Sequence, residues 1–211
     1  RSTGTNLPTS TLHTVVTAGT TEASGYRWGN ALVSVLSKVD YDYAGRYFLS
    51  ASYRRDGSSK LSRDHRWGNF WSVAGSWNIG REAFMTGCEA VSDLRLRTSY
   101  GVNGTLPAGN YAYMNLVTYN TKYMGQPGGT LSTLADNALS WETNYTYNLG
   151  LDFGLWNNRL RGSVEYFNRI SKNLLQDMPI TRVTGFSSTL RNIGRIRNRG
   201  VEAELKADLL R

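Results

Sequence analysis

The long segment 103–138 carries the side chains best suited to hold a ligand. It combines tyrosine rings with asparagine amides at Tyr111, Tyr113, Asn115, Tyr119, Asn120 and Tyr123. Aromatic faces stack on sugar rings, and amides donate and accept hydrogen bonds with hydroxyls. These six residues therefore form a candidate oligosaccharide-binding site. Tyrosine-rich loops also pack on one another or on a partner protein, so that alternative stays open.

The chemistry of an enzyme or a metal centre is missing from the sequence. His13 and His65 stand alone in polar stretches, without the spacing of a metal site or a catalytic triad. The single Cys88 excludes an internal disulfide framework and a cysteine-based zinc site. We therefore predict no catalytic activity, no cofactor and no metal.

The chain is basic, with a formal net charge of +8. Such a balance can indicate binding to nucleic acid, anionic lipid or acidic substrates. The densest basic run is Arg191, Arg195, Arg197 and Arg199. No nucleic-acid-binding motif accompanies it, so nucleic acid is not a predicted partner.

Alternation of apolar and polar residues recurs in seven stretches and predicts strands with one apolar and one polar face. These stretches are 30–43, 46–56, 66–79, 93–102, 139–153, 159–170 and a last one containing 201–209. No apolar run approaches the roughly 18 residues that a membrane helix needs. The sequence therefore predicts an all-β, antiparallel fold.

The connections between these stretches alternate between short and long. The turns near residues 44, 80–92 and 156 lie on one side, and the loops 57–65, 103–138 and 171–192 lie on the other. Transmembrane β-barrels have short periplasmic turns, long outer loops and an aromatic girdle at each interface. The predicted girdles are Tyr43, Tyr47, Trp77 and Phe153 at the short turns, and Tyr53, Trp67, Tyr100, Trp141 and Tyr166 toward the long loops.

A soluble β-sandwich is the alternative, because its strands also alternate. Two features favour the barrel. The polar faces carry charges of both signs strand after strand, as a water-filled lumen does, and large aromatics lie at the ends of the apolar faces. On the sandwich reading, the chain is a binding or structural domain without a role in transport.

Several short motifs follow one another in order along the chain. The first is Arg54-Arg55-Asp56-Gly57-Ser58-Ser59-Lys60-Leu61 followed by Arg66-Trp67-Gly68-Asn69-Phe70-Trp71-Ser72. The others are Leu94-Arg95-Leu96-Arg97-Thr98-Ser99-Tyr100-Gly101, Leu139-Ser140-Trp141-Glu142, Gly150-Leu151-Asp152-Phe153, Thr184-Gly185-Phe186, Asn192-Ile193-Gly194 and Asn198-Arg199-Gly200-Val201-Glu202. Together, these motifs resemble the SusC/RagA family of TonB-dependent outer-membrane transporters.

The resemblance implies that residues 30–211 are part of a transmembrane barrel of roughly 22 strands, plugged by an N-terminal domain. Seven strands are too few to close such a barrel. We therefore expect the plug, the TonB-contacting segment and the remaining strands to lie outside this chain.

The resemblance also implies a function. It implies import of oligosaccharides or peptides across the outer membrane, driven through the TonB complex, with a SusD-like surface lipoprotein as the lid. Membrane lipid would surround the barrel. Residues 1–29, rich in Thr, Ser and Gly, are expected to form an extracellular loop.

Overall fold

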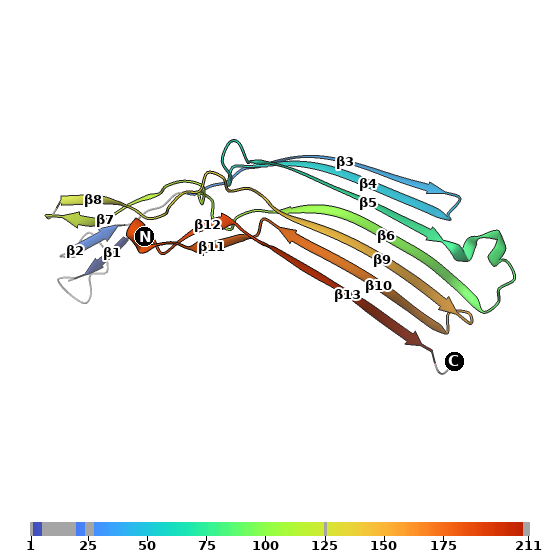
Figure 1. Ribbon diagram of the computed structural model, residues 1–211. Helices are drawn as coiled ribbons and strands as arrows, with labels where there is room; N and C mark the ends of the chain where they lie inside the picture. The colour runs from blue at the N-terminus through green and yellow to red at the C-terminus, as the bar shows by residue number, and fades with distance from the viewer. Residues whose placement is uncertain (1, 6–19, 24–27, 125, 209–211) are drawn as a thin grey trace.

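A seven-stranded antiparallel sheet dominates the computed structural model, which describes residues 2–5, 20–23, 28–124 and 126–208 (Figure 1). Its strands are β3 (Leu32–Tyr43), β4 (Tyr47–Ser58), β5 (Trp67–Asn78), β6 (Val91–Thr105), β9 (Glu142–Leu155), β10 (Leu160–Lys172) and β13 (Arg195–Ala207). Their order in the sheet is β13-β10-β9-β6-β5-β4-β3. This confirms the predicted all-β, antiparallel segment.

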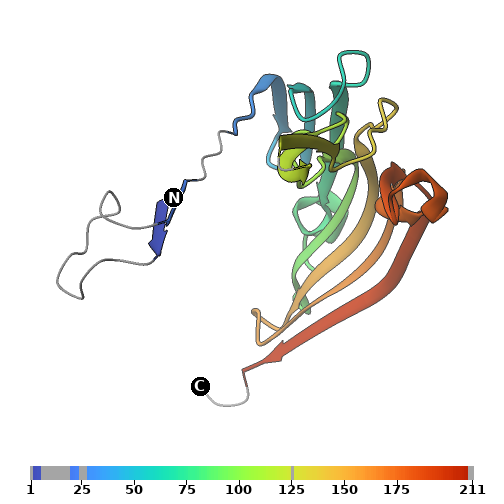
Figure 2. The ribbon, with the colours of Figure 1, turned by 90° about the vertical axis from the view of Figure 1, so that its left-hand side faces the viewer.

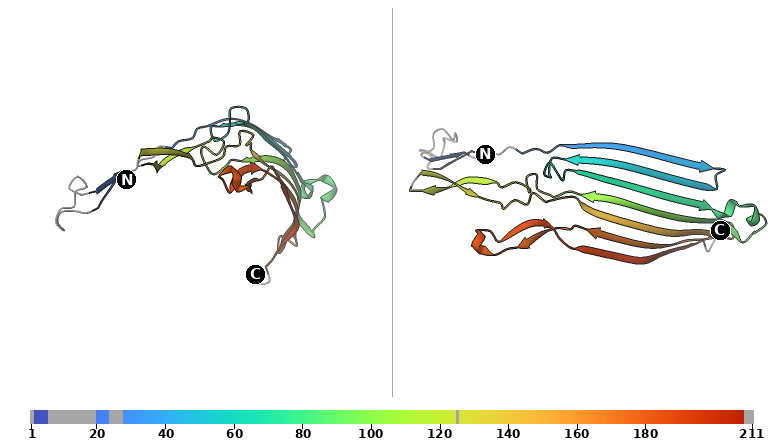
Figure 3. Two further views of the ribbon diagram at one scale, coloured as in Figure 1. Left: turned by 60° about the vertical axis from the view of Figure 1, so that its left-hand side comes forward. Right: turned by 45° about the horizontal axis from the view of Figure 1, so that its top comes forward.

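The sheet is curved across its width, as a section of a barrel wall is (Figures 2 and 3). Strands β3 and β13 are its two edges. A sheet edge presents unpaired backbone N–H and C=O groups, which a closed barrel pairs. The sheet is therefore a section of a barrel.

The alternation of short and long connections is also present. Residues 44–46 make a tight turn, in which Ala44 and Gly45 have φ angles of 55° and 62°. Two successive positive φ angles are typical of the type I′ turn, whose twist matches that of the paired strands. The short connections share one end of the sheet, and the long ones share the other (Figure 1).

The connection from β5 to β6 is the longest at its end of the sheet. It contains two single 3₁₀ turns, η2 (Ile79–Arg81) and η3 (Ala83–Met85). The sequence predicts one helical turn here, around residues 82–85. Within the described parts of the chain, no helix has the length and apolarity needed to traverse a bilayer.

Each of the two longest predicted loops contains a hairpin. Residues 103–138 include β7 (Val117–Tyr123) paired with β8 (Gln126–Leu131). Residues 171–192 include β11 (Leu175–Pro179) and β12 (Ser188–Asn192), joined through η4 (Arg182–Thr184). These long connections are therefore partly ordered by their own backbone pairing.

Residues 1–29 also contain a strand pair, where the sequence indicates only loop. Ser2–Thr5 (β1) pairs antiparallel with Thr20–Ala23 (β2). This short pair is separate from the seven-stranded sheet. The extracellular placement of residues 1–29 remains a prediction.

The register places large apolar side chains on one face of all seven strands. On β4 and β5, Tyr47 is opposite Trp77 and Ala51 is opposite Val73, while Leu96 and Leu151 continue the same face on β6 and β9. Many of these side chains are exposed, since no second sheet covers them among the described residues. A β-sandwich buries this face against a second sheet, so the sandwich alternative is wrong for this chain.

The buried core lies at the long-loop end. Leu61 and Leu139 are fully buried, and Phe70 and Trp141 are 3% and 8% exposed. The rings of Phe70 and Trp141 meet edge to face, with centroids 5.1 Å apart. This loop-end cluster packs the long connections against the sheet.

Trp141 is a correction to the predicted girdle. The sequence places it and Leu139 on the apolar face of a strand beginning at 139, but β9 begins at Glu142. Trp141 turns into the loop-end cluster, and its indole N–H donates to the carbonyl of Arg66 at 3.1 Å. It is a core residue of the loops.

Candidate functional site

Three of the six candidate ligand-binding residues have described side chains, and all three contact neighbouring loops. The Tyr111 hydroxyl donates to the carbonyl of Gly29 at 3.2 Å and accepts from its N–H at 3.1 Å. Tyr113 packs against the loop-end cluster. The side-chain oxygen of Asn115 accepts from the N–H of Ala135 at 2.8 Å. These residues join separate parts of the long loops to one another.

The other three candidates, Tyr119, Asn120 and Tyr123, belong to β7. Their side chains lie outside the described part of the structure. A binding role for the six residues remains a prediction. The contacts of Tyr111 and Asn115 also fit the alternative that these loops pack on themselves.

The polar face carries a charged network at mid-sheet. Arg97 on β6 donates two hydrogen bonds to Asp152 on β9, at 2.7 and 2.9 Å. It also forms an ion pair with Glu165 on β10, at 3.5 Å. Gly150 is opposite both Arg97 and Glu165 in the register. A Cβ atom there would approach the guanidinium to 3.1 Å, so the glycine leaves room for Arg97 to reach across β9.

The alternation in β10 suggests that Glu165 pairs with Arg161 and Arg169 on its own strand. The structure corrects this, because Glu165 pairs with Arg97 two strands away, and Arg161 pairs with Asp208 at 3.5 Å. The sequence identifies the charged face but not the partners, since cross-strand pairing depends on the register.

An open hollow of about 420 Å³ lies beside this network. The polar-face residues that line it are Asp40, Asp42, Phe48, Ser50, Ala74, Ser76, Arg97, Ser99, Asn148, Gly150 and Glu165. Small side chains on β5 and β6 leave this space open, and Asp40 is held on its rim by a 2.7 Å hydrogen bond from Ser50. The wall is therefore hollowed where its side chains carry charges and hydroxyls.

A second hollow, of about 460 Å³, lies at the short-connection end of the polar face. Its lining is almost wholly polar: Asn78, Gly80, Arg81, Ser92, Asp93, Arg95, Asn158 and Arg161. The side-chain oxygen of Asn78 is buried and has no hydrogen-bond partner among the described residues. The lining of this second hollow indicates a surface suited to water and polar ligands.

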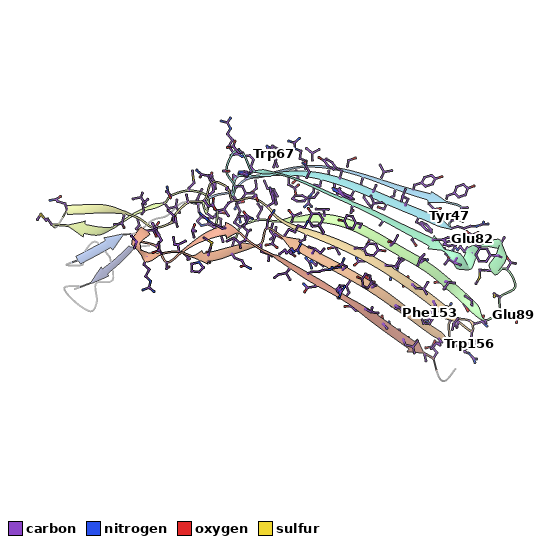
Figure 4. All side chains as sticks on the ribbon, viewed as in Figure 1. Tyr47, Trp67, Glu82, Glu89, Phe153 and Trp156 are labelled. Atoms are coloured by element: carbon purple, nitrogen blue, oxygen red, sulfur yellow. The ribbon has the colours of Figure 1, made fainter. Side chains whose placement is uncertain are left out.

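The carboxylate of Glu82 joins the β5–β6 connection to Tyr47 and Trp77, two of the girdle residues at the short-connection end of the sheet. One oxygen of Glu82 accepts from the Tyr47 hydroxyl at 2.5 Å and from the Trp77 indole N–H at 2.9 Å. Its other oxygen pairs with Arg46 at 3.4 Å. Hydrogen bonds from Tyr47 and then Trp77 lower the pKa of Glu82 from its ordinary range. Figure 4 shows Glu82 beside Tyr47 at this end, with Trp67 at the other.

Sequence reasoning missed this function of Glu82, although a signal was present. The tight turn at residues 44–46 fixes the β3–β4 register, and the girdle pattern brings Tyr47 and Trp77 to the end where Glu82 follows. Both rings have a polar atom at the edge and require a hydrogen-bond acceptor when they are packed. Glu82 carries the first carboxylate after β5 in the sequence, so it is the nearest candidate for this acceptor.

Comparison with known proteins identifies the sheet. The sequence model of the family described as TonB dependent receptor-like, beta-barrel, matches residues 3–211. This chain belongs to the TonB-dependent receptor β-barrel family. The seven strands are therefore a section of an outer-membrane barrel wall, with the apolar face toward lipid and the polar face toward the lumen.

Individual relatives agree with the resemblance to SusC/RagA. The chain is 36% identical to the TonB-dependent receptor SusC of Bacteroides thetaiotaomicron over 194 residues, which is 88% of this chain and 19% of SusC. A solved RagAB peptide transporter is 35% identical and superposes with a TM-score of 0.79, covering 84% of this chain and 20% of that one. The closed-closed state of the RagAB peptide importer gives a TM-score of 0.85 at 30% identity, covering 96% and 23%.

A more distant receptor shares the fold alone. The siderophore receptor PirA of Pseudomonas aeruginosa superposes with a TM-score of 0.59 at 15% identity, covering 86% of this chain and 32% of PirA. The chain spans about a fifth of the length of the SusC and RagAB relatives.

Proposed function

We propose that these strands form part of the lumen wall of an outer-membrane transporter that imports oligosaccharides or peptides with a SusD-like surface lipoprotein. Passage would be driven through the TonB complex, which would contact parts of the protein outside this chain. The residues described here would act passively, as wall, hydrated path and mouth.

One observation carries this proposal: the acidic side chains of the seven strands are confined to one face of the sheet. All nine carboxylates of the seven strands lie on the polar face. They are Asp40, Asp42, Asp56, Asp93, Glu142, Asp152, Glu165, Glu202 and Glu204. Charged groups at a lipid-facing position cost several kcal/mol at mid-membrane, while lumen positions tolerate them. A wall divided in this way suits the passage of polar solutes.

The long-loop end of the wall, here called the mouth, supports the same function. The loop-end cluster joins connections that are far apart in sequence, and Lys60 donates to the carbonyls of Pro107 and Ala108, both at 3.1 Å. A mouth ordered in this way offers fixed surfaces for a lipoprotein lid and for substrate. The six Tyr and Asn candidates of segment 103–138 lie in this region.

Whole-cell uptake tests the proposal. Uptake of labelled oligosaccharides and labelled peptides is compared between cells with and without the gene, and with and without the neighbouring lipoprotein. We expect one substrate class to be lost in both deletions. Unchanged uptake of both classes would contradict the proposed function.

Substrate binding at the mouth has its own test. In the whole transporter, Tyr119→Ala combined with Tyr123→Ala should weaken ligand binding about 30-fold, since stacking contributes on the order of 1 kcal/mol per ring. Tyr43→Ala, at the opposite end of the sheet, is the control. Equal affinity in both variants would remove these residues from the site.

A further inference from the structure

The outward face holds a set of cations that the transport function does not use. The strand residues on this face include five basic side chains, Arg55, Lys172, Arg195, Arg197 and Arg199, and no carboxylate. All five lie at the long-loop end of their strands. At its long-loop end, the apolar face therefore carries positively charged strand residues and no negatively charged ones.

The register shows that the β13 arginines and Lys172 form one patch. Arg195 is opposite Lys172, Arg197 is opposite Ile170, and Arg199 is opposite Asn168. Alternate residues of a strand are about 6.8 Å apart, so the three arginines extend over about 14 Å. All four cations are exposed.

These cations have no anionic partner in the described chain. Arg197 donates to Asn168 at 2.9 Å, and Lys172 lies over the ring of Tyr145 at 4.9 Å. Arg191, from the same basic run, differs because it pairs with Asp136 at 3.2 Å. Such uncompensated charges on a lipid-facing surface favour an anion from outside the described chain.

The depth of the patch indicates what that anion is. Directly below Arg199, the outward residues of β13 are Val201, Ala203, Leu205 and Ala207, an apolar run of about 20 Å. The apolar band of a membrane barrel is about 25 Å tall. The arginines lie beyond this apolar run, at the long-loop end of the strand, which in a transmembrane barrel is the end toward the outer leaflet, and a cation costs little near that interface.

We propose that Arg195, Arg197, Arg199 and Lys172 bind the phosphate groups of an outer-leaflet lipid, of which lipid A is the phosphorylated representative. Guanidinium groups match phosphate oxygens bidentately, and the neighbouring Tyr145 and Tyr166 belong to the ring-rich zone that flanks acyl chains. The inference rests on the proposed outer-membrane function, and within it defines a lipid site separate from the lumen.

Native mass spectrometry of the whole transporter, titrated with lipid A in detergent, tests the site. Each basic residue near an anionic surface contributes about fivefold. R195Q/R197Q/R199Q should therefore bind lipid A on the order of 100-fold more weakly. The matched control R161Q/R169Q/K206Q removes the same charge from the lumenal face and should bind as the wild type does. Dephosphorylated lipid A should bind wild type and triple variant equally.

Three results would overturn the proposal while leaving the transport function intact. The triple variant could bind lipid A as tightly as the wild type. Inorganic phosphate could displace lipid A at equal concentration, which would identify a free-anion site. The triple variant could instead lose a bound protein subunit, which would identify a protein interface. Failure of the wild-type barrel to insert into lipid nanodiscs would contradict the proposed function itself and the lipid site with it.

Discussion

The hydroxyl of Tyr47 lies 2.5 Å from the carboxylate of Glu82 and donates a hydrogen bond to it. The ring of Tyr47 stacks on Trp77, with centroids 6.2 Å apart and planes inclined by 12°. Trp77 donates to the same carboxylate oxygen. A residue of the β5–β6 connection therefore fixes two girdle rings at the short-connection end of the wall.

Glu82→Gln should loosen this connection because it removes the charge that both donors bind. Hydrogen exchange of segment 79–90, in which the Met85 N–H donates to the Glu82 carbonyl, measures the loosening. Glu89→Gln, an exposed glutamate of the same connection without a side-chain partner among the described residues, is the control. Equal exchange in the two variants would refute this role of Glu82.

The same contact predicts a pH dependence. Folding lowers the pKa of Glu82, so its stabilising contribution is fully present above the ordinary glutamate range and is lost as the pH falls through the lowered folded value. The protection of segment 79–90, which is the intrinsic exchange rate divided by the observed rate at the same pH, should therefore fall in acid in the wild type. The Gln variant should lack this transition. A wild-type profile that stays flat through the acid range would count against the contact.

Asp152→Asn should destabilise the wall by about 1 kcal/mol, since Asp152 makes charge-assisted hydrogen bonds in a partly exposed site. Arg97→Gln removes the other partner, and the double variant completes a thermodynamic cycle. Chemical denaturation of the transporter in detergent provides the unfolding free energies. We expect the double variant to cost less than the two single changes together. Strict additivity would show that the pair does not interact.

Gly57→Ala should disturb the long-loop end. Trp67 is opposite Gly57, and a Cβ atom at position 57 would lie 2.7 Å from the ring. Overpacking of this kind costs about 1–3 kcal/mol. Gly29→Ala is the control because nothing lies within 4 Å of a Cβ atom there. Tryptophan fluorescence and thermal unfolding should change in the first variant alone, and a shift of similar size in both would disprove the packing argument.

Leu139→Ala should loosen the packing of the long loops, because Leu139 is fully buried in the loop-end cluster. Such truncations cost about 2–5 kcal/mol. Leu131→Ala, a half-exposed leucine of β8, removes the same atoms from an open site. Limited proteolysis should cut the first variant in the long loops much faster than the second. Identical cleavage rates would show that the cluster does not order the loops.

The fold could be predicted from the sequence because period-two alternation and short turns are local signals. The partners in the charged side-chain pairs could not be predicted in this way, because they depend on the strand register. Glu165 has an arginine four positions away on each side along its own strand, Arg161 and Arg169, yet the register brings Arg97 to it across Gly150. Trp141 continues the parity of β9 but lies before the strand begins, where packing on Phe70 overrides alternation.

The basic residues of the patch are visible in the sequence, but their place on the sheet is not. Arg195, Arg197 and Arg199 have the same parity as Val201, which places them on the lipid-facing side. Considered as a run, they indicate only general basicity. The position of these arginines relative to the membrane can be inferred only after the apolar band has been located on the sheet.

The division of the two faces is the central claim, and spin labels placed singly at residues 145–152 of β9 test it most directly. The labels are attached to cysteines in the whole transporter, with Cys88 replaced by serine, in lipid nanodiscs. Labels at odd positions should collide more with oxygen dissolved in the lipid, and labels at even positions more with a water-soluble nickel complex, since the side chains alternate between lipid and lumen. Equal access of the nickel complex to all eight positions would contradict the membrane-wall account.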